Sequence, residues 1–575
     1  MDSTCTIKKK NILPELWHNA WKYLLLAASL AATVKIIFFG FDIDEQYAVS
    51  MAYRMVRGDR MFLEMWEPHQ TSAFFSAAFL WLFVHITGSF SYSVLFLRCV
   101  GVLMQLFISL FFYTTFLKFS SENTAFAVAV FYYNIIPKNS PVPDFSNMLL
   151  WFSALMFLCL LRFSSTESTN WKNTLFWLFL SGVCTSALIL SYPTCLFVII
   201  PVIIGICNTS SRHNVLRNVM FYLLTCILCG ITWLAYFLSH MSFSSFYSGV
   251  TAMFSDGSHS SSLTDKILNN FSYLRDVIPY IFIAVLIAFI LWKAADFISK
   301  REFNYYLCLL IVFAAEQLWI WYRMQKRLNY PGILSFFLLF LSFRYYHSTR
   351  KKTSEKRTLY PSLYFFGSIS SLFLLLGSFL ASNTQLYESI GYITIGIIVF
   401  LYLLGNQQNE NSALWKIVIF SIIGVAILHK GFYISHMYGH DTIFVSRQKA
   451  ESGPMAGIYG RYSDGYEYNL RNEIMHTYVA DGSKVLLVSN KTIAYLQGNY
   501  EVCNYSTIST PTIDEQLFTY WRLYPDKRPE YILWDTIAEG YIASDQDINN
   551  RLLSDAELLV DNGDFLIYKV SPNSF

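Results

Sequence analysis

The sequence carries little charge. Only 14% of its 575 residues are Asp, Glu, Lys or Arg, while 54% are hydrophobic. A soluble domain carries roughly 25% charged residues. Apolar runs recur from Tyr23 to His429, and many are close to the ~20 residues that a helix needs to cross a bilayer. We therefore expect a polytopic α-helical membrane protein, and the net charge of +3 gives no sign of a nucleic-acid partner.

Two further features are missing. The polar carboxyl-terminal part contains one cysteine, Cys503, so no disulfide framework is expected there. The first apolar run, which follows Lys8, Lys9 and Lys10, has no small-residue cleavage site. It therefore indicates a first transmembrane helix with a cytoplasmic amino end rather than a cleaved signal.

Basic loops predict the topology, because Lys and Arg concentrate on the cytoplasmic side. The loop 344–357 holds six Lys or Arg residues and one Glu, so it is assigned to the cytoplasm. If the amino end and the loop 344–357 are both cytoplasmic, an even number of helices must cross the membrane between them, and the sequence offers one apolar segment too many. The Ala- and Ser-rich segment 71–88 is the best candidate to lie along the outer interface instead of crossing. The apolar segments lie near 20–41, 71–88, 92–117, 124–136, 145–162, 173–190, 194–207, 218–240, 271–292, 304–321, 328–346, 360–381, 389–404 and 413–429.

This count predicts about 13 transmembrane helices in the plasma (inner) membrane, with the amino end inside. Residues 1–429 form the membrane domain, in which 42–91 is a first outer loop with membrane-lying helices. Residues 430–575 form a small extracytoplasmic α/β domain. Its β-branched and aromatic runs at 484–490, 530–535 and 564–570 are typical of strands, and 514–524 is typical of a helix. No catalytic motif is visible there, so packing or positioning of the acceptor is its expected role.

Two carboxylates, Asp44 and Glu45, stand where the first helix leaves the membrane. The residues after them have the period of a surface-lying helix that puts Arg54 on its polar face and ends at Gly58. Two interpretations stay open. The acids start a helix whose dipole favours them, or one of them acts as a general base that takes a proton from a hydroxyl group.

Cations near the same surface have two interpretations as well. Arg323, Lys326 and Arg327 share one helical face and are predicted to lie outside, where basic residues are less common. They either anchor the helix at the lipid headgroups or clamp a phosphate, and Arg98, near the start of the segment 92–117, could join them. Arg54 is a further candidate for contact with substrate.

Three polar positions are less specific. Glu67 and His69, in "WEPHQ", could ligate a divalent metal ion, orient a phosphate or simply form a turn. Asp144, in "SPVPDFSN", could contact substrate, although capping of the next helix is a complete alternative explanation. Tyr192 comes to the same outer boundary by the topology count and is taken as a substrate contact.

The order of these motifs resembles the GT-C glycosyltransferases. An acidic pair follows the first helix, "WEPHQ" follows about twenty residues later, an arginine opens a later helix, and "PD" starts another. The resemblance is nearest to the branch of protein O-mannosyltransferases, lipid A aminoarabinose transferases and RgtA-like enzymes. It implies that Asp44 is the catalytic carboxylate with Glu45 beside it, and that Asp144 matches a family aspartate.

The resemblance also implies membrane-lying helices in the first loop and inversion at the anomeric carbon. Glu67 and Pro68 match only part of a family stretch, and "SYP" at 191–193 stands where relatives often carry a lysine.

The sequence thus predicts a membrane glycosyltransferase. Its donor would be a polyprenyl-phosphate sugar, and its acceptor a hydroxyl group of a lipid, glycan or protein at the outer face. A transporter or flippase of lipid-linked sugars is the alternative. Transporters commonly show internal repeats and charged residues near mid-membrane. Here no repeat is visible by eye and the charges gather at one predicted surface, which favours the enzyme.

Overall fold

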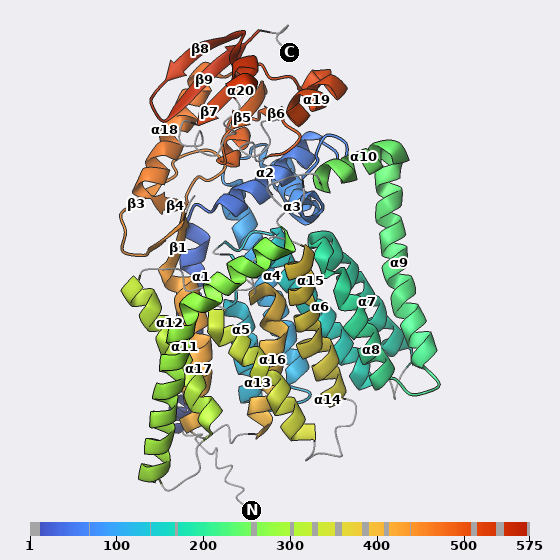
Figure 1. Cartoon of the computed structure of the whole chain (residues 1–575), viewed down its shortest axis with the longest axis vertical. Coiled ribbons are helices and arrows are strands. Elements are labelled where there is room, and N and C mark those ends of the chain that lie inside the picture. The colour runs from blue at the N-terminus through green and yellow to red at the C-terminus, as the bar shows by residue number, and fades with distance from the viewer. Residues whose placement is uncertain are drawn as a thin grey trace, which may run out of the picture.

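The computed structural model describes residues 12–67, 69–138, 140–166, 171–254, 262–299, 304–324, 332–350, 359–381, 390–407, 413–436, 439–507, 515–535 and 546–571. Most of these residues are helical, and the helices stand roughly side by side along the molecule (Figure 1). The amino-terminal half contains α1 (Ile12–Phe38), α2 (Ile43–Arg57), α3 (Ala73–Thr87), α4 (Ser93–Phe116), α5 (Glu122–Asn134), α6 (Phe145–Thr166), α7 (Trp171–Ser191), α8 (Ile199–Thr209), α9 (Val215–His240) and α10 (Phe243–Phe254).

The remaining membrane helices are α11 (Leu263–Ser299), α12 (Tyr305–Met324), α13 (Gly332–Arg350), α14 (Leu359–Ser362), a π-helical turn (Leu363–Ile369), α15 (Ser370–Ala381), α16 (Ile390–Gln407) and α17 (Ala413–Phe432). Within the described ranges, nine helices are long and apolar enough to cross a bilayer. Only 17% of the apolar window of α9 and 11% of that of α11 is buried inside the protein. Outward apolar faces of this kind need a lipid environment, so the expected polytopic helical membrane protein is confirmed.

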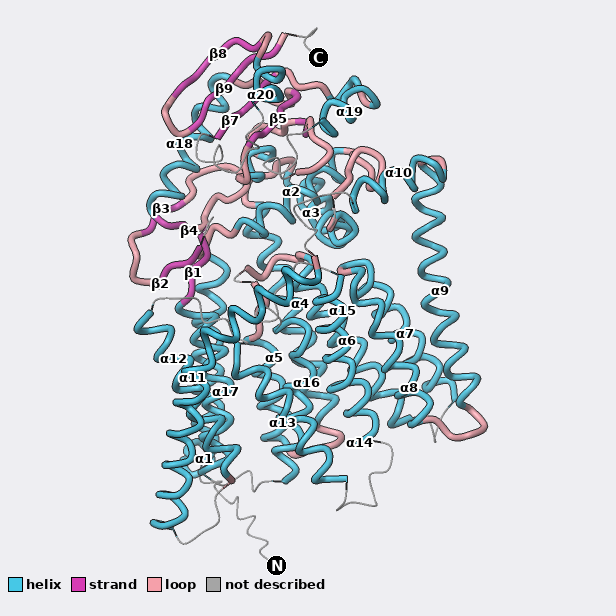
Figure 2. The backbone as a smooth tube through the Cα atoms, in the orientation of Figure 1, coloured by secondary structure: helices cyan, strands magenta, loops and turns pink. Residues whose placement is uncertain are grey.

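Helix α3 corresponds to the segment expected to lie along the interface. Figures 1 and 2 show it nearly end-on beside α2, whereas α9 is seen lengthwise. By length and composition alone, Gln70–Thr87 could span a membrane. The crosswise course of α3 fits the expectation that this segment does not cross the membrane. The count of 13 transmembrane helices stays a prediction.

Helix α2 is more deeply enclosed than its sequence suggests. The amphipathic pattern predicts a surface-lying helix, yet every residue from Glu45 to Arg54 is buried. The helix is covered by α3 and by the carboxyl-terminal region, whose short 3₁₀ helix Thr492–Leu496 packs against it. Gly58 ends the helix as expected, with a φ of 106° that a residue with a side chain rarely adopts.

The carboxyl-terminal region is a small α/β unit at the end of the molecule opposite the amino terminus (Figure 2). Its five strands lie in the order β6-β5-β7-β9-β8, with β5 parallel to β6 and β7, and β9 antiparallel to β7 and β8. The strands of this sheet are β5 (Lys484–Val488), β6 (Glu501–Val502), β7 (Tyr531–Asp535), β8 (Ala556–Asp561) and β9 (Phe565–Val570). The three strand-like runs are therefore confirmed as β5, β7 and β9.

Two short hairpins connect this unit to the membrane helices. The hairpins comprise β1 (Tyr433–His436), β2 (Gly439–Thr442), β3 (Arg447–Lys449) and β4 (Tyr459–Arg461). The helices of the α/β unit are α18 (Tyr462–Tyr478), α19 (Glu515–Leu523) and α20 (Gln546–Leu553). The predicted helix 514–524 is confirmed as α19. The backbone N–H of Phe41 donates to the carbonyl of Ser435 at 2.9 Å, so the exit of α1 is fixed to the first hairpin.

Candidate functional site

The first part of the site is the turn between α1 and α2. Gly40 has a φ of 108°, which lets the chain bend sharply after α1. Asp42 then caps α2, because its carboxylate accepts hydrogen bonds from the N–H groups of Asp44 (3.0 Å) and Glu45 (3.1 Å). Burial, and then the neighbouring acids, raise the pKa of Asp42. The cap fixes the direction in which the next two carboxylates leave the helix.

Asp44 forms an ion pair with a lysine that lies 94 positions away. Its Oδ2 lies 2.5 Å from the Nζ of Lys138, and the two side chains keep 36% and 26% of their surface exposed. Burial disfavours the charge on Lys138, but Asp44 and Asp144 outweigh that effect and raise the lysine's pKa. A carboxylate and a permanently charged ammonium group are therefore offered together to a ligand.

The loop that carries Lys138 is held tightly against α4. A Cβ at Gly101 would lie 1.6 Å from the carbonyl oxygen of Pro141, so only glycine permits this approach. The amide of Asn147 donates to the carbonyls of Ser140 (2.8 Å) and Val142 (2.9 Å). The loop therefore presents Lys138 from a rigid support.

Aromatic rings form one wall of the site. The Nζ of Lys138 lies 4.3 Å from the centre of the Phe145 ring, and the ring of His69 stacks on Phe145 with centroids 4.1 Å apart. Tyr192 is next, 5.5 Å from His69. The structure thus brings Asp44, His69 and Tyr192, which lie far apart in the sequence, to one place around Lys138.

Glu45 and Arg98 are paired inside the protein. The guanidinium donates to both carboxylate oxygens, at 2.6 and 2.5 Å, and the two side chains are 0% and 1% exposed. Arg98 also donates to backbone carbonyls at the end of α1, including that of Gly40 at 2.7 Å, and Ser140 donates to Glu45 at 2.5 Å. The sequence predicts a catalytic role for Glu45 and a substrate contact for Arg98. In this structure the two side chains are paired in the interior, and both roles stay predictions.

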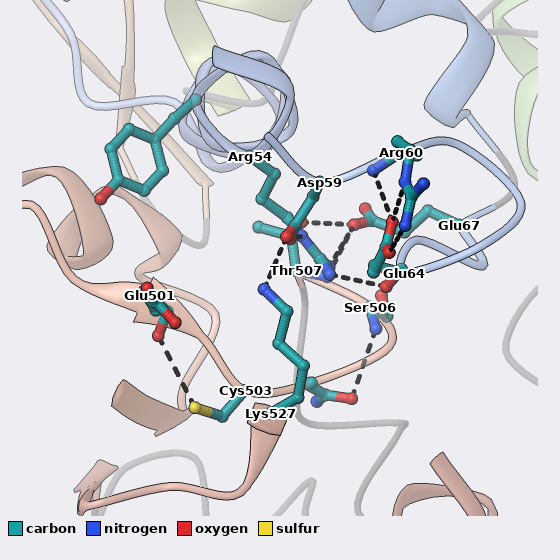
Figure 3. A network of polar contacts seen from close by, with 12 residues as sticks. Arg54, Asp59, Arg60, Glu64, Glu67, Glu501, Cys503, Ser506, Thr507 and Lys527 are labelled. Carbon is teal, nitrogen blue, oxygen red and sulfur yellow. Dashed lines mark hydrogen bonds and ion pairs between the residues drawn. The ribbon is translucent and has the colours of Figure 1, made fainter. Parts of the chain in front are cut away.

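Arg54 also lies in a closed network, drawn in Figure 3. Its guanidinium is 0% exposed and bonds to Asp59 (2.8 Å), Glu67 (3.1 Å) and the carbonyl of Glu64 (2.8 Å). Its side chain is enclosed by these partners, and the predicted substrate contact of Arg54 stays a prediction. The residue ties the end of α2 to the loop that leads to His69.

The carboxyl-terminal unit completes this network. The backbone N–H of Thr507 donates to Glu67 at 2.9 Å, and the Nζ of Lys527 lies 2.6 Å from Asp59 (Figure 3). The loop after α2 is thus fastened to the α/β unit two residues before His69.

The predicted metal ligands do not form a metal site in this arrangement. Glu67 already neutralises Arg54, and a carboxylate that faces a guanidinium is a poor ligand for a second cation. In the described ranges, no group of three or more His, Cys, Asp or Glu side chains is placed to hold a metal ion. The divalent ion at Glu67 and His69 therefore stays a prediction.

The predicted phosphate clamp lies largely outside the described residues. Arg323 is in the last turn of α12, although its side chain is not described, and Lys326 and Arg327 lie outside the described residues. All three stay predictions.

Asp144 lies at the start of α6, where its Oδ1 accepts a hydrogen bond from the N–H of Asn147 at 2.6 Å. The capping interpretation is therefore confirmed. The side chain is buried, and burial raises its pKa from 3.8 to about 7, although Lys138 and Asn147 oppose the shift. Its charge also acts on Lys138, so Asp144 is part of the electrostatic surroundings of the site.

The raised pKa predicts a pH dependence of stability. The folded protein holds a proton on Asp144 that the unfolded chain releases, so Asp144 destabilises the fold progressively as the pH rises from about 4 to about 7, by about 4 kcal/mol in total. Asn at this position keeps the cap but cannot titrate. Thermal unfolding in detergent should show the melting temperature of the wild type falling relative to that of Asp144→Asn across this range. Parallel pH profiles for the two proteins would contradict the assignment.

Lys138 is the site residue that the sequence interpretation missed. It stands six positions before Asp144 in the same short loop, on the side predicted to be external. A basic residue on that side is unusual, and the same signal drew attention to Arg323. What the sequence could not show is that this loop lies against the start of α2.

Comparisons with known proteins give a distant likeness. No protein-family model matches the chain, and no curated protein matches it. Among solved structures, it is similar to ArnT from Cupriavidus metallidurans in the apo state (9% identity, TM-score 0.43) and bound to undecaprenyl phosphate (11%, 0.41). Both similarities cover 96% of this chain and 98% of the other. The chain is also similar to the apo oligosaccharyltransferase of Archaeoglobus fulgidus (10%, 0.44), over 98% of this chain and 75% of the other.

Proposed function

We propose that this chain is an integral-membrane glycosyltransferase. It takes a sugar from a polyprenyl-phosphate donor and passes it to a hydroxyl group of a lipid, glycan or protein at the outer face of the plasma membrane. The observation that supports this most directly is the partly exposed pair of Asp44 and Lys138. The pair stands where a chain with lipid-facing helices emerges from its helical bundle.

Each member of the pair has a separate task. Asp44 is the general base, since a carboxylate within hydrogen-bond reach can take the proton of an attacking hydroxyl. Lys138 binds the phosphate of the donor before and during transfer, because an ammonium group and a phosphate form a charge-assisted hydrogen bond. Asp144 and the aromatic wall of His69, Phe145 and Tyr192 hold the lysine and border the sugar.

The reaction balances without a cofactor. The acceptor oxygen forms a bond to the anomeric carbon while the bond from that carbon to the phosphate oxygen breaks. The phosphate leaves with the bonding electrons as polyprenyl phosphate, and Asp44 receives the acceptor's proton. Attack from the face opposite the leaving phosphate inverts the anomeric configuration. Arg323, Lys326 and Arg327 remain candidates for holding the phosphate further from the reacting carbon.

A reconstituted transfer assay tests the proposal. The protein is placed in vesicles with a labelled undecaprenyl-phosphate sugar, and we expect the label to move to a hydroxyl acceptor. Lys138→Met should raise the KM for the donor at least about tenfold, because a charged hydrogen bond to the phosphate is lost. The matched control is Lys118→Met, which removes an exposed lysine from the loop after α4.

Movement of intact labelled donor across the bilayer, with no label on any acceptor, would instead identify a flippase. Equal donor KM values for wild type and Lys138→Met would remove Lys138 from the site.

A further inference from the structure

The carboxyl-terminal unit contains a cavity that the proposed reaction does not use. It has a volume of about 540 Å³ and lies between α19 and α20. Volumes of 300 to 1,000 Å³ are usual for sites that bind small molecules. Figure 1 shows α19 and α20 at the end of the molecule away from the membrane helices, so lipid headgroups do not reach this cavity.

The charge of the cavity is positive. Arg522, Arg528 and Arg551 line it, and Glu515 is the one acidic residue among its lining residues, which gives a net charge of +2. Glu515 pairs with Arg551. Two guanidinium groups are therefore left without a carboxylate partner among the lining residues.

Arg528 is the most informative of these side chains. It is partly buried, and its Nε is shielded from water without a hydrogen-bond partner among the residues that the structure describes. A buried donor without an acceptor costs free energy. Because the Nε is closed off from the cavity, an anion there would pair with the charge of Arg528, which lines the cavity, rather than bond to the Nε.

The rest of the lining suits a sugar ring. The guanidinium carbon of Arg551 lies over Phe518, 3.9 Å from the ring centre, so a planar cationic group lines the cavity next to an aromatic ring. Asn550 and Ser554 add short hydrogen-bonding groups on the same side of α20. Planar groups border the faces of sugars, while amides and hydroxyls bond their hydroxyl groups.

We propose that this cavity binds an anionic saccharide, a sugar that bears a phosphate or carboxylate group. The anion bonds to Arg528 and Arg522, and the ring lies against Arg551 and Phe518. This site is separate from Asp44 and Lys138, and it does not depend on the proposed transfer reaction. It gives the carboxyl-terminal unit a recognition role toward polar glycans outside the membrane.

Titration calorimetry on the full-length protein in detergent tests this site. Glucose 6-phosphate should bind, neutral glucose should bind at least about tenfold more weakly, and Arg528→Gln and Arg551→Gln should each weaken binding of glucose 6-phosphate by about tenfold or more. Lys569→Gln is the control, because it removes an exposed positive charge from β9 of the same unit outside the cavity. Its affinity should match that of the wild type.

Three outcomes would overturn the proposal. They are no binding of glucose 6-phosphate at millimolar concentrations, equal affinities for glucose and its phosphate, or equal affinities for the wild type and both arginine variants. Inorganic phosphate that binds as tightly as glucose 6-phosphate would overturn the assignment to a saccharide. An unchanged melting temperature of each variant shows that the fold is intact, and Arg528→Lys, which keeps the charge, should retain part of the affinity.

Discussion

Asp44→Asn should lower the rate of sugar transfer by about 10²- to 10⁴-fold, which is the usual contribution of a positioned general base. The amide has nearly the same shape as the carboxylate but cannot accept the acceptor's proton. The cap of α2 is made by Asp42 and stays intact. The expected change is therefore in kcat, with a donor KM close to that of the wild type and an unchanged melting temperature.

The kinetic effects on kcat and KM distinguish the role of Asp44 from that of Lys138. Loss of the base lowers kcat, whereas loss of Lys138 mainly raises the donor KM. Asp44→Glu gives a second readout, because the longer side chain retains the base but moves it by about an ångström, which alone can lower a rate strongly. Asp526→Asn, in the exposed turn Pro525–Lys527, is the control for removing a carboxylate.

Transfer by Asp44→Asn within about tenfold of the wild-type rate would rule out Asp44 as the base. Since Glu45 is fully buried against Arg98, it could not then replace Asp44 without a rearrangement of α2. Transfer by Asp44→Asn at nearly the wild-type rate would instead indicate that a group on the acceptor itself serves as the base.

Arg98→Met should be the most damaging single substitution for stability. It leaves Glu45 charged and buried with the hydroxyl of Ser140 but without a cationic partner, and breaking a buried ion pair from one side costs about 3–5 kcal/mol. The carbonyls of Ile36, Ile37, Phe39 and Gly40 at the end of α1 lose their donor in the same step. We expect a clearly lower melting temperature in detergent and reduced yield.

The exposed pair of Arg275 and Asp276 is a matched control. Both side chains are more than two thirds exposed, and pairs of this kind contribute about 0–1 kcal/mol. Arg275→Met should therefore leave the melting temperature nearly unchanged. The double variant Glu45→Leu with Arg98→Met should recover part of the loss, because no buried charge remains unpaired. If Arg98→Met were as stable as Arg275→Met, the buried pair would not hold α1 and α2 together.

The membrane helices and the strands of the carboxyl-terminal unit could be recognised from local patterns. A run of apolar residues or an alternation of β-branched and aromatic residues is a property of neighbouring positions, so β5, β7 and β9 appear where they were expected. The end of α2 at Gly58 was predictable for the same reason, since its left-handed backbone suits glycine.

The partners of charged residues were not predictable in this way. In the sequence, Asp44 and Glu45 are adjacent acids, and either could be the general base. They differ only in the direction in which their side chains leave α2. Asp44 meets Lys138 at a partly exposed position, whereas Glu45 meets Arg98 in the interior. Arg54 likewise belongs to the polar face of an amphipathic pattern, but the carboxyl-terminal unit covers that face.

By itself, the sequence determined that this protein has apolar helices able to cross a membrane, a carboxyl-terminal α/β unit, and acids placed just after the first helix. These follow from local composition, because hydrophobicity and backbone preference act over a few neighbouring residues. Only the tertiary structure decided which acid is partly exposed, which arginines are buried in ion pairs, and that Lys138 lies beside Asp44. Long-range packing brings residues separated by up to 468 positions into hydrogen-bond contact, and the burial it imposes sets the surroundings of each charge.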